Sequence, residues 1–324
     1  MFPRFFSFLL TAVFLFSFSS QAIHAQAGAT DSGPLSEPKI IYIAPGSSLK
    51  TIAKTLESEG VIANATVFNW YTRLSGRGTL LKAGEYEFPA RASLDDVTKI
   101  LTQGVSLDRK LTFPEGVTTA EILDQINAAE GLSGEISVEP LEGSLFPNTY
   151  YYSRNDTRDS FVKRMQDAMA KESQRLWEKR DKDLPIKSLE EAIILASIVE
   201  KETARVEEYA VVASVYLNRL RINKKLEADP TVIYALTMGQ KKLDRPLLLK
   251  DLRVKSPWNT YRNKGLPPTP ICNPGLGALE GVLRPVATPY IFFVADGTGG
   301  HVFAETFAEH ERNVAKWRKI NSGN

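Results

Sequence analysis

Cysteine and histidine are rare in this 324-residue chain. It has one cysteine, Cys272, so no intrachain disulfide can form, and its three histidines are His24, His301 and His310. The histidines belong to no HExxH motif and to no other set of spaced metal ligands. The lone cysteine has no paired histidine site either. The sequence therefore predicts neither a catalytic metal nor thiol catalysis, and we expect no cofactor.

An excess of charge of one sign is also lacking. The 40 Lys and Arg residues are nearly balanced by 38 Asp and Glu residues, which gives a net charge of +2. This balance argues against a nucleic-acid partner. The chain contains no GxSxG motif, no Walker loop and no GxGxxG in a βαβ frame, and the glycines at 297, 299 and 300 fit a hairpin turn. With these catalytic motifs absent, aspartate and glutamate side chains are the remaining candidates for catalysis.

The chain has one long apolar run, at its start. Arg4 is followed by 21 uncharged residues, Phe5 to Ala25, enough to span a bilayer as a helix. The small-x-small pattern at 25–27 is the alternative, because cleaved signal peptides end in this way. Either segment would export the residues that follow. Residues 28–38 are rich in small and polar residues and are expected to be a linker.

The stretch Ser188–Thr203 predicts a buried helix. Ser188 and Glu191 have the spacing of a capping box, and apolar residues occupy most positions around the helix after them. The helix nevertheless ends in two carboxylates, Glu200 and Glu202. The rest of the chain is organised around this element.

Helical geometry separates the two glutamates. At about 100° per residue, Glu190, Ser197 and Lys201 form one polar stripe. Glu200 lies roughly 80° from the middle of that stripe and Glu202 roughly 120° away, on the apolar side. Apolar surroundings and the negative end of the helix both raise the pKa of a carboxyl group. Glu202 is therefore the candidate general acid for a glycosidic bond, and a solvated glutamate at a frayed helix end is the alternative.

Residues 39–106 predict a small unit in the order β–α–α–β–α. Its strands are expected at 40–44 and 81–88, and its helices at 47–59, 65–74 and 93–104. The remaining residues, 107–324, predict a mainly helical domain that closes with a hairpin around 296–300 and a helix at 307–320.

Two polar and aromatic segments supply candidate sugar-binding residues. Glu142 and Tyr150 lie in segment 141–152, which suits either sugar binding or a loop that fills the core. Asn259 and Tyr261 lie in a long loop, 256–275, dense in proline, glycine and aromatic residues, and such rigid loops commonly build binding clefts.

Two further polar residues lie in predicted helices. Asn218 interrupts the apolar side of a helix at 207–221 and is either structural or positions a substrate group. Asp229 stands before Pro230 at a helix start, where a capping role explains it and a role in the site is the alternative.

Several long motifs together carry a resemblance to a known family. They are, in chain order, LEGSLFPNTYYY, ASIVEKET, VASVYLNRL, EADPTVIYAL, SPWNTYRNKGLPPTPICNPG and FFVADGTGGHVFAETFAEHERNV. From roughly Lys39 to Ile320 the chain resembles the YceG/MltG family of endolytic murein transglycosylases. The upstream segments APGSSLKTIAKTL and LKAGEYEF are similar to LysM-type carbohydrate-binding modules.

The resemblance implies an α+β fold in four parts. These are a membrane anchor at 1–27, a linker at 28–38, a LysM-like subdomain at 39–106 and a lysozyme-like catalytic domain at 107–324. It implies a single-pass protein of the bacterial inner membrane with its catalytic domain in the periplasm. The implied partners are the membrane, peptidoglycan glycan strands and peptidoglycan synthases (penicillin-binding proteins).

The resemblance also implies a reaction. In that family the second glutamate of EKET is the catalytic acid, which falls on Glu202 and agrees with the helix geometry. The enzyme would cleave the MurNAc–GlcNAc β-1,4 bond of nascent strands, form 1,6-anhydroMurNAc ends and terminate glycan elongation. A hydrolytic muramidase is the nearest alternative, with Glu142, Glu200 or Asp229 as its second carboxylate. A non-catalytic peptidoglycan-binding scaffold is the other.

Overall fold

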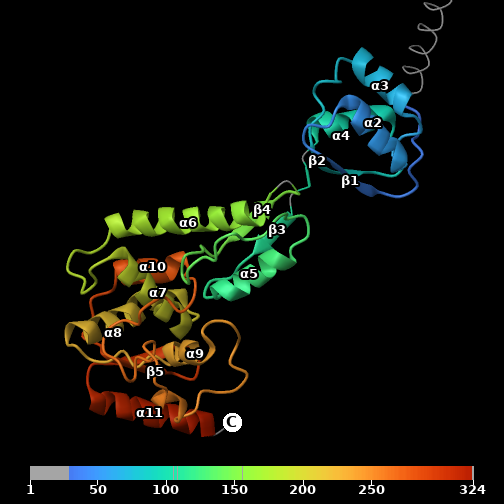
Figure 1. Cartoon of the computed structure of the whole chain (residues 1–324). Coiled ribbons are helices and arrows are strands. Elements are labelled where there is room, and N and C mark those ends of the chain that lie inside the picture. Colours follow the sequence, from blue (N-terminus) through green and yellow to red (C-terminus); the bar gives the residue numbers. More distant parts are fainter. Residues whose placement is uncertain (1–28, 105, 108, 155, 323–324) are drawn as a thin grey trace, which may run out of the picture. The chain divides into compact units, whose positions relative to one another are not determined.

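The computed structural model describes residues 29–104, 106–107, 109–154 and 156–322. The chain divides into two compact units. Unit 1 contains the residues up to Arg109 and a short later segment, Tyr151–Asp156. Unit 2 contains Lys110–Tyr150 and the residues from Thr157 onward. The described residues form ten α-helices and small two-stranded sheets, so the fold class is α+β (Figure 1).

Unit 1 has its elements in the order that the sequence predicts. They are β1 (Lys39–Ile43), α2 (Leu49–Ser58), α3 (Ala65–Leu74), β2 (Gly84–Phe88) and α4 (Leu94–Gln103). β1 and β2 pair antiparallel, with Ile41 opposite Tyr86. The helices begin at polar caps: the side chains of Ser48, Asn64 and Ser93 accept backbone N–H groups of the first turn. Their apolar faces and the sheet enclose one core.

Residues 29–38, expected to be a linker, are part of unit 1. Ala29 and Leu35 are buried, and Leu35 belongs to the core of the unit. The backbone of Arg91 donates to the carbonyl of Leu35 at 2.8 Å and accepts from Gly33 at 3.1 Å. The segment is mostly polar, but burial of its two apolar residues stabilises the folded segment by more than the loss of conformational entropy destabilises it.

Unit 2 is mainly helical. Its elements are α5 (Thr119–Ala128), α6 (Arg158–Glu178), α7 (Leu189–Glu202), α8 (Tyr209–Arg221), α9 (Asp229–Thr237), α10 (Leu276–Leu283), β5 (Phe292–Ala295), β6 (His301–Ala304) and α11 (Phe307–Ser322), with short 3-10 turns at Val206–Glu208 and Asp251–Arg253. Two further strands, β3 (Arg109–Thr112) and β4 (Thr149–Tyr152), cross the sequence boundaries between the units. β3 and β4 pair, and β4 falls in the segment 141–152, where the sequence showed no clean period.

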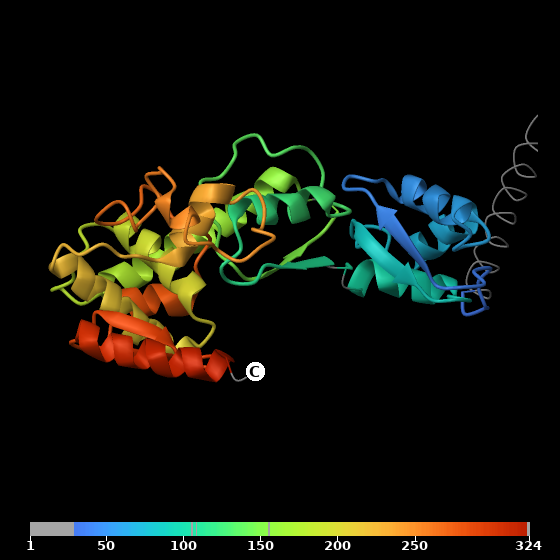
Figure 2. The same cartoon turned by 90° about the horizontal axis from the view of Figure 1, so that it is seen from below.

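The apolar helix α7 lies at the centre of unit 2, packed against α6, α8, α9 and α10 (Figure 1). Its buried side chains are a main part of the unit's hydrophobic core. The antiparallel hairpin β5–β6 is closed by Asp296, whose carboxylate accepts the N–H groups of Thr298 and Gly300. Helix α11 covers this hairpin (Figure 2).

The proposed membrane segment lies outside the described residues. Within the part of the chain that the structure describes, no helix is both long enough and apolar enough to cross a bilayer.

Candidate active site

Helix α7 is fixed at its start by a cap and along its length by the core. Ser188 accepts the N–H of Glu191 at 3.2 Å, as the capping-box spacing predicts. In a full capping box the carboxylate of Glu191 would accept the N–H of Ser188. Here it accepts the N–H of Lys187 instead, at 2.6 Å. Ser197, expected on a polar stripe, is fully buried and accepts the N–H of Ile271 at 3.0 Å. The helix therefore also holds the loop that precedes α10.

Glu202 ends α7 inside a cleft of about 390 Å³. The hydroxyl of Tyr216, from α8, donates to Glu202 Oε1 at 2.5 Å. Apolar side chains from two other parts of unit 2, Leu226 and the neighbours Phe292 and Phe293, line the same cleft. Charged and polar side chains, among them Arg219 and Asp229, form the rest of the lining. The carboxyl group thus has one firm partner in a cleft with mixed walls that opens to solvent.

This environment raises the pKa of Glu202 to about 7. Burial is the main cause, because it disfavours the charged form, and the negative charge of Asp229 acts in the same direction. The hydrogen bond from Tyr216 and the positive charge of Arg219 oppose it. A substantial fraction of Glu202 is therefore protonated at neutral pH, as general-acid catalysis requires.

Glu200 occupies a different environment, although it is only two residues away. Its Oε1 accepts the hydroxyl of Tyr209 at 2.9 Å, and its Oε2 accepts the N–H of Gly275 at 2.9 Å. Burial raises its pKa. Its two oxygens thus tie the start of α8 and the start of α10 to α7, and Glu200 does not line the Glu202 cleft.

Asp229 and Tyr261 are the other sequence-predicted residues that reach the Glu202 cleft. Asp229 is the first residue of α9 and does not cap it; the N-cap is Ala228, which has no side-chain bond. The carboxylate instead accepts the hydroxyl of Tyr261 at 2.6 Å. Pro230 explains the helix start by itself, since its fixed φ suits the first turn. The expected capping role of Asp229 is therefore wrong.

Glu142 and Tyr150 do not line the Glu202 cleft. Glu142 Oε1 accepts both the N–H and the hydroxyl of Thr119, at 2.8 and 3.0 Å. Tyr150 donates to the carbonyl of Phe146 at 2.8 Å and packs between Phe113 and Phe161, where burial raises its pKa to about 12. The interpretation of segment 141–152 as a core-filling loop fits these two residues.

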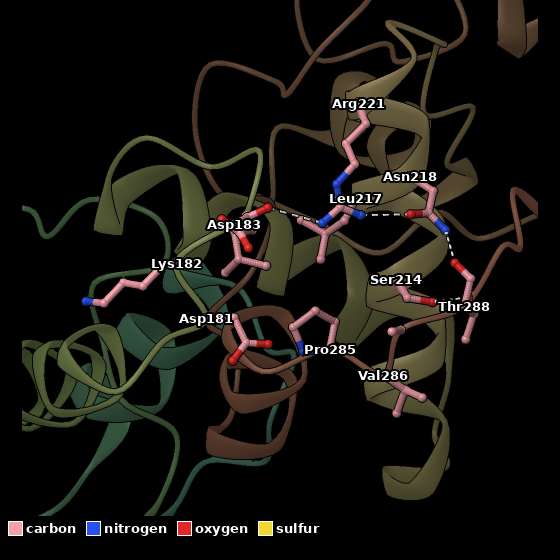
Figure 3. A pocket seen from close by; sticks show the side chains of 12 residues that line it. Asp181, Lys182, Asp183, Ser214, Leu217, Asn218, Arg221, Pro285, Val286 and Thr288 are labelled. Atoms are coloured by element: carbon pink, nitrogen blue, oxygen red, sulfur yellow. Dashed lines mark hydrogen bonds between the residues drawn. The ribbon is translucent and has the colours of Figure 1, made fainter.

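Asn218 and Asn259 do not line the Glu202 cleft either. Asn218 donates to the carbonyls of Thr288 and Tyr290 and accepts from Arg221, in a different pocket of unit 2 (Figure 3). Asn259 is fully buried, and its amide donates to the carbonyls of Leu252 and Val254. It shapes the loop that presents Tyr261, because its Oδ1 accepts the N–H of that residue at 2.9 Å.

Tyr216 and Arg219 are cleft residues that sequence reasoning missed. Both lie on α8 and are almost fully buried, at 1% and 7% exposure, so their spacing looks like that of core residues. Arg219 donates to the carbonyls of Leu226 and Ile291, at 2.6 and 2.7 Å. It thereby ties two walls of the cleft to α8. The sequence feature that could have indicated this site is an arginine next to the apolar face of a predicted helix, because a buried arginine needs polar partners.

The residues just after Glu202 join α7 to the hairpin. The hydroxyl of Thr203 donates to the carboxylate of Glu208 at 2.9 Å. This carboxylate also accepts the N–H of His301 at 2.9 Å and lies 2.7 Å from the ring Nδ1 of His301. Burial opposes ionisation of Glu208, but these hydrogen bonds outweigh it and hold its pKa below the ordinary value. The network fixes the exit of α7 and so the position of Glu202.

A family model described as the YceG-like family matches residues 41–316. The chain belongs to the YceG-like family. The resemblance seen in the sequence motifs is thus confirmed.

Across the described residues, no group of three or more His, Cys, Asp or Glu side chains is arranged to hold a metal ion.

Three named proteins are similar to this YceG-like chain. The endolytic murein transglycosylase of Bacillus subtilis is 32% identical over 88% of this chain and 85% of its own length. The protein of the same name from Streptococcus pneumoniae D39 is 29% identical over 85% of this chain, which spans only 58% of that relative. A crystal structure of a yceG-like protein from Listeria monocytogenes is 32% identical, with a TM-score of 0.51, over 86% of this chain and 99% of that one.

The pKa of Glu202 in this YceG-like protein can be moved in both directions. Tyr216→Phe removes a hydrogen bond that favours the carboxylate, so we expect the pKa to rise above about 7. Asp229→Asn removes a negative charge, so we expect it to fall. Carboxyl-carbon NMR titration, with the Glu202 signal assigned by its loss in Glu202→Gln, measures both. Shifts of the same sign in both variants would contradict this electrostatic account.

Proposed function

We propose that this protein is an endolytic lytic transglycosylase of peptidoglycan, with Glu202 as its catalytic acid. The observation that carries the proposal is Glu202 itself: a carboxyl group of pKa about 7, held by Tyr216, in an open cleft. Membership of the YceG-like family supports it, as do the relatives named endolytic murein transglycosylases.

The proposed reaction needs one acid and no water. Tyr216 engages Oε1 of Glu202, and we assign Oε2 as the proton donor. Glu202 protonates the oxygen of the MurNAc–GlcNAc β-1,4 bond as the bond from C1 of MurNAc breaks. The 6-hydroxyl of the same sugar then attacks C1 and returns its proton to the carboxylate. The products are a free GlcNAc 4-hydroxyl and a 1,6-anhydroMurNAc end.

The intramolecular nucleophile explains why a second protein carboxylate is not required. A hydroxyl on the reacting sugar has a high effective molarity. Asp229 still has a place in this scheme. It lines the same cleft, its negative charge adds to the rise in the pKa of Glu202, and it would stabilise positive charge that develops on the sugar.

Asp229 also favours a second candidate, a hydrolytic muramidase. A muramidase positions a second carboxylate roughly 5–9.5 Å from the acid, and Asp229 lines the Glu202 cleft. The two reactions differ in their products, since hydrolysis adds one water to the new reducing end.

Mass spectrometry of digested glycan strands separates the candidates. Purified strands are incubated with residues 28–324. We expect anhydroMurNAc ends that lack the added water. Fragments carrying one water would establish the muramidase instead, and the absence of any cleavage would overturn both enzymatic proposals.

The finer biological setting is part of the same proposal. The apolar run Phe5–Ala25 would anchor the chain in the bacterial inner membrane, with both units in the periplasm. Unit 1 would act as a LysM-like wall-binding module, supported by its β–α–α–β–α order. Cleavage of nascent strands there would end glycan elongation, near the peptidoglycan synthases.

A further inference from the structure

Unit 2 has a second cavity, of about 380 Å³, beside the Glu202 cleft. Two pairs of consecutive residues are divided between them. Lys201 lines the second cavity and Glu202 the cleft; Pro230 lines the second cavity and Asp229 the cleft. Because neighbouring Cα atoms are about 3.8 Å apart, the two spaces share these two short stretches of wall.

The second cavity has a cationic rim. Four positive side chains line it: Lys201, Lys241, Lys242 and Arg245. Arg245 is paired with Asp251 at 2.6 and 3.0 Å, and Glu121 is the one acid among the lining residues, so two positive charges remain in excess. The carboxylate of Glu121 already accepts the N–H of Thr118 at 3.0 Å. Lys242 is 89% exposed at its side chain, 3.7 Å from Glu121, and Lys241 is exposed as well. The surplus of positive charge favours an anionic ligand.

Its floor is apolar. Ile233 and Tyr234 contribute from α9, Ile271 from the loop before α10, and Leu247 from the loop after α9. Ile233 is still 36% exposed. An apolar floor inside a cationic rim fits a ligand that combines small apolar groups with carboxylates.

We propose that this second cavity binds the peptide stem of peptidoglycan through the stem's carboxylates. The inference rests on the proposed function, because the stem is attached to the lactyl group of MurNAc, the sugar whose C1 would react at Glu202. A stem of three to five residues extends about 10–17 Å, far enough to enter a space that shares walls with the cleft. Its alanine side chains match the floor and its free carboxylates match the rim.

A phosphate group is the other anion that such a rim could attract. Phosphate sites are usually built from backbone N–H groups at a helix N-terminus. Two helix starts line the cavity, at Thr118 before α5 and at Pro230 in α9. The N–H groups of Thr118, Thr119 and Glu121 are already accepted by Glu121, Glu142 and Thr118, and Pro230 has no N–H. The available cations are side chains around apolar residues. The structure therefore favours a peptide over a phosphate.

The test measures binding, so it does not depend on turnover. The Glu202→Gln protein is titrated calorimetrically with two fragments: a GlcNAc–MurNAc oligosaccharide carrying peptide stems, and the same oligosaccharide after an amidase has removed them. We expect the stem-bearing fragment to bind at least about tenfold more tightly. Lys241→Glu with Lys242→Glu, added to the same protein, should bring the ratio of the two dissociation constants close to one. Lys171→Glu, an exposed charge reversal on α6, is the matched control and should leave the ratio unchanged.

Each outcome decides the inference. Equal affinities for the two fragments, or a ratio that the double variant leaves unchanged, would overturn it. Displacement of the stem-bearing fragment by inorganic pyrophosphate at a concentration comparable to its own would assign the rim to phosphate and also overturn it. Anhydro ends formed by the wild type, together with equal affinities of the Glu202→Gln protein for the two fragments, would refute only the stem site. A stem preference without any strand cleavage would refute only the proposed function.

Discussion

Glu202→Gln should lower the rate of strand cleavage by about 10³-fold, the size of effect typical for loss of a positioned general acid. The amide keeps the shape of the side chain and can still accept the hydrogen bond from Tyr216, but it has no acidic proton to give to the glycosidic oxygen. Initial rates of anhydroMurNAc release from purified glycan strands measure the loss.

The matched control is Glu200→Gln, the same change two residues earlier on α7. Glu200 does not line the Glu202 cleft and holds Gly275 and Tyr209. The glutamine retains one acceptor oxygen, so one of these two bonds is weakened. We expect a lower melting temperature and a cleavage rate within a few-fold of the wild type.

The pair of variants distinguishes the two glutamates of the EKET motif. A large rate loss in Glu200→Gln at a temperature where the protein is fully folded would move the acid from Glu202 to Glu200. Equal and small losses in both would show that the chemistry does not use α7, and the proposed mechanism would fail.

The sequence predicted the central helix and its end well, because both depend on local patterns. The Ser188 cap, the apolar circumference of α7 and the angular separation of Glu200 from Glu202 all follow from spacing along one element. The burial that raises the pKa of Glu202 follows from the same pattern, since the apolar side of a core helix faces other elements.

The polar residues of the site were harder to predict, because their partners come from distant parts of the chain. Asn218, Asn259 and Tyr150 each looked available for substrate, yet each bonds to backbone carbonyl groups that would otherwise be unsatisfied. Which carbonyl lacks a partner depends on how loops meet in three dimensions. One sequence does not contain that information.

The same limit explains why Tyr216 was missed. On α8 its position belongs to the buried face, and packing alone accounts for it. Only the approach of α7 brings the carboxylate of Glu202 to its hydroxyl, a contact between residues 14 positions apart. A buried tyrosine needs a hydrogen-bond partner, so the sequence could have indicated that some polar group lies there but not which one.

Asn273→Ala should lower the free energy of unfolding of unit 2 by about 3 kcal/mol, because it leaves several buried groups without partners. Asn273 is fully buried. Its side-chain oxygen accepts the N–H of Leu145 at 2.9 Å, and its amide donates to the carbonyl of Val117 at 3.1 Å and to the hydroxyl of Thr119 at 3.2 Å. The residue thus joins the start of α5, segment 141–152 and the loop before α10.

Urea unfolding followed by tryptophan fluorescence measures this loss, since three of the four tryptophans lie in unit 2: Trp177, Trp258 and Trp317. Asn263→Ala is the control. The amide of Asn263 also donates to backbone carbonyls, those of Ser256 and Asn259, at 2.8 and 3.0 Å, but the residue is exposed. Water can replace those bonds, so the expected cost is below about 1 kcal/mol. Equal losses in the free energy of unfolding for the two alanine variants would contradict this prediction. The stability of the loops around α7 would then come from apolar packing and not from the hydrogen bonds of the buried amide.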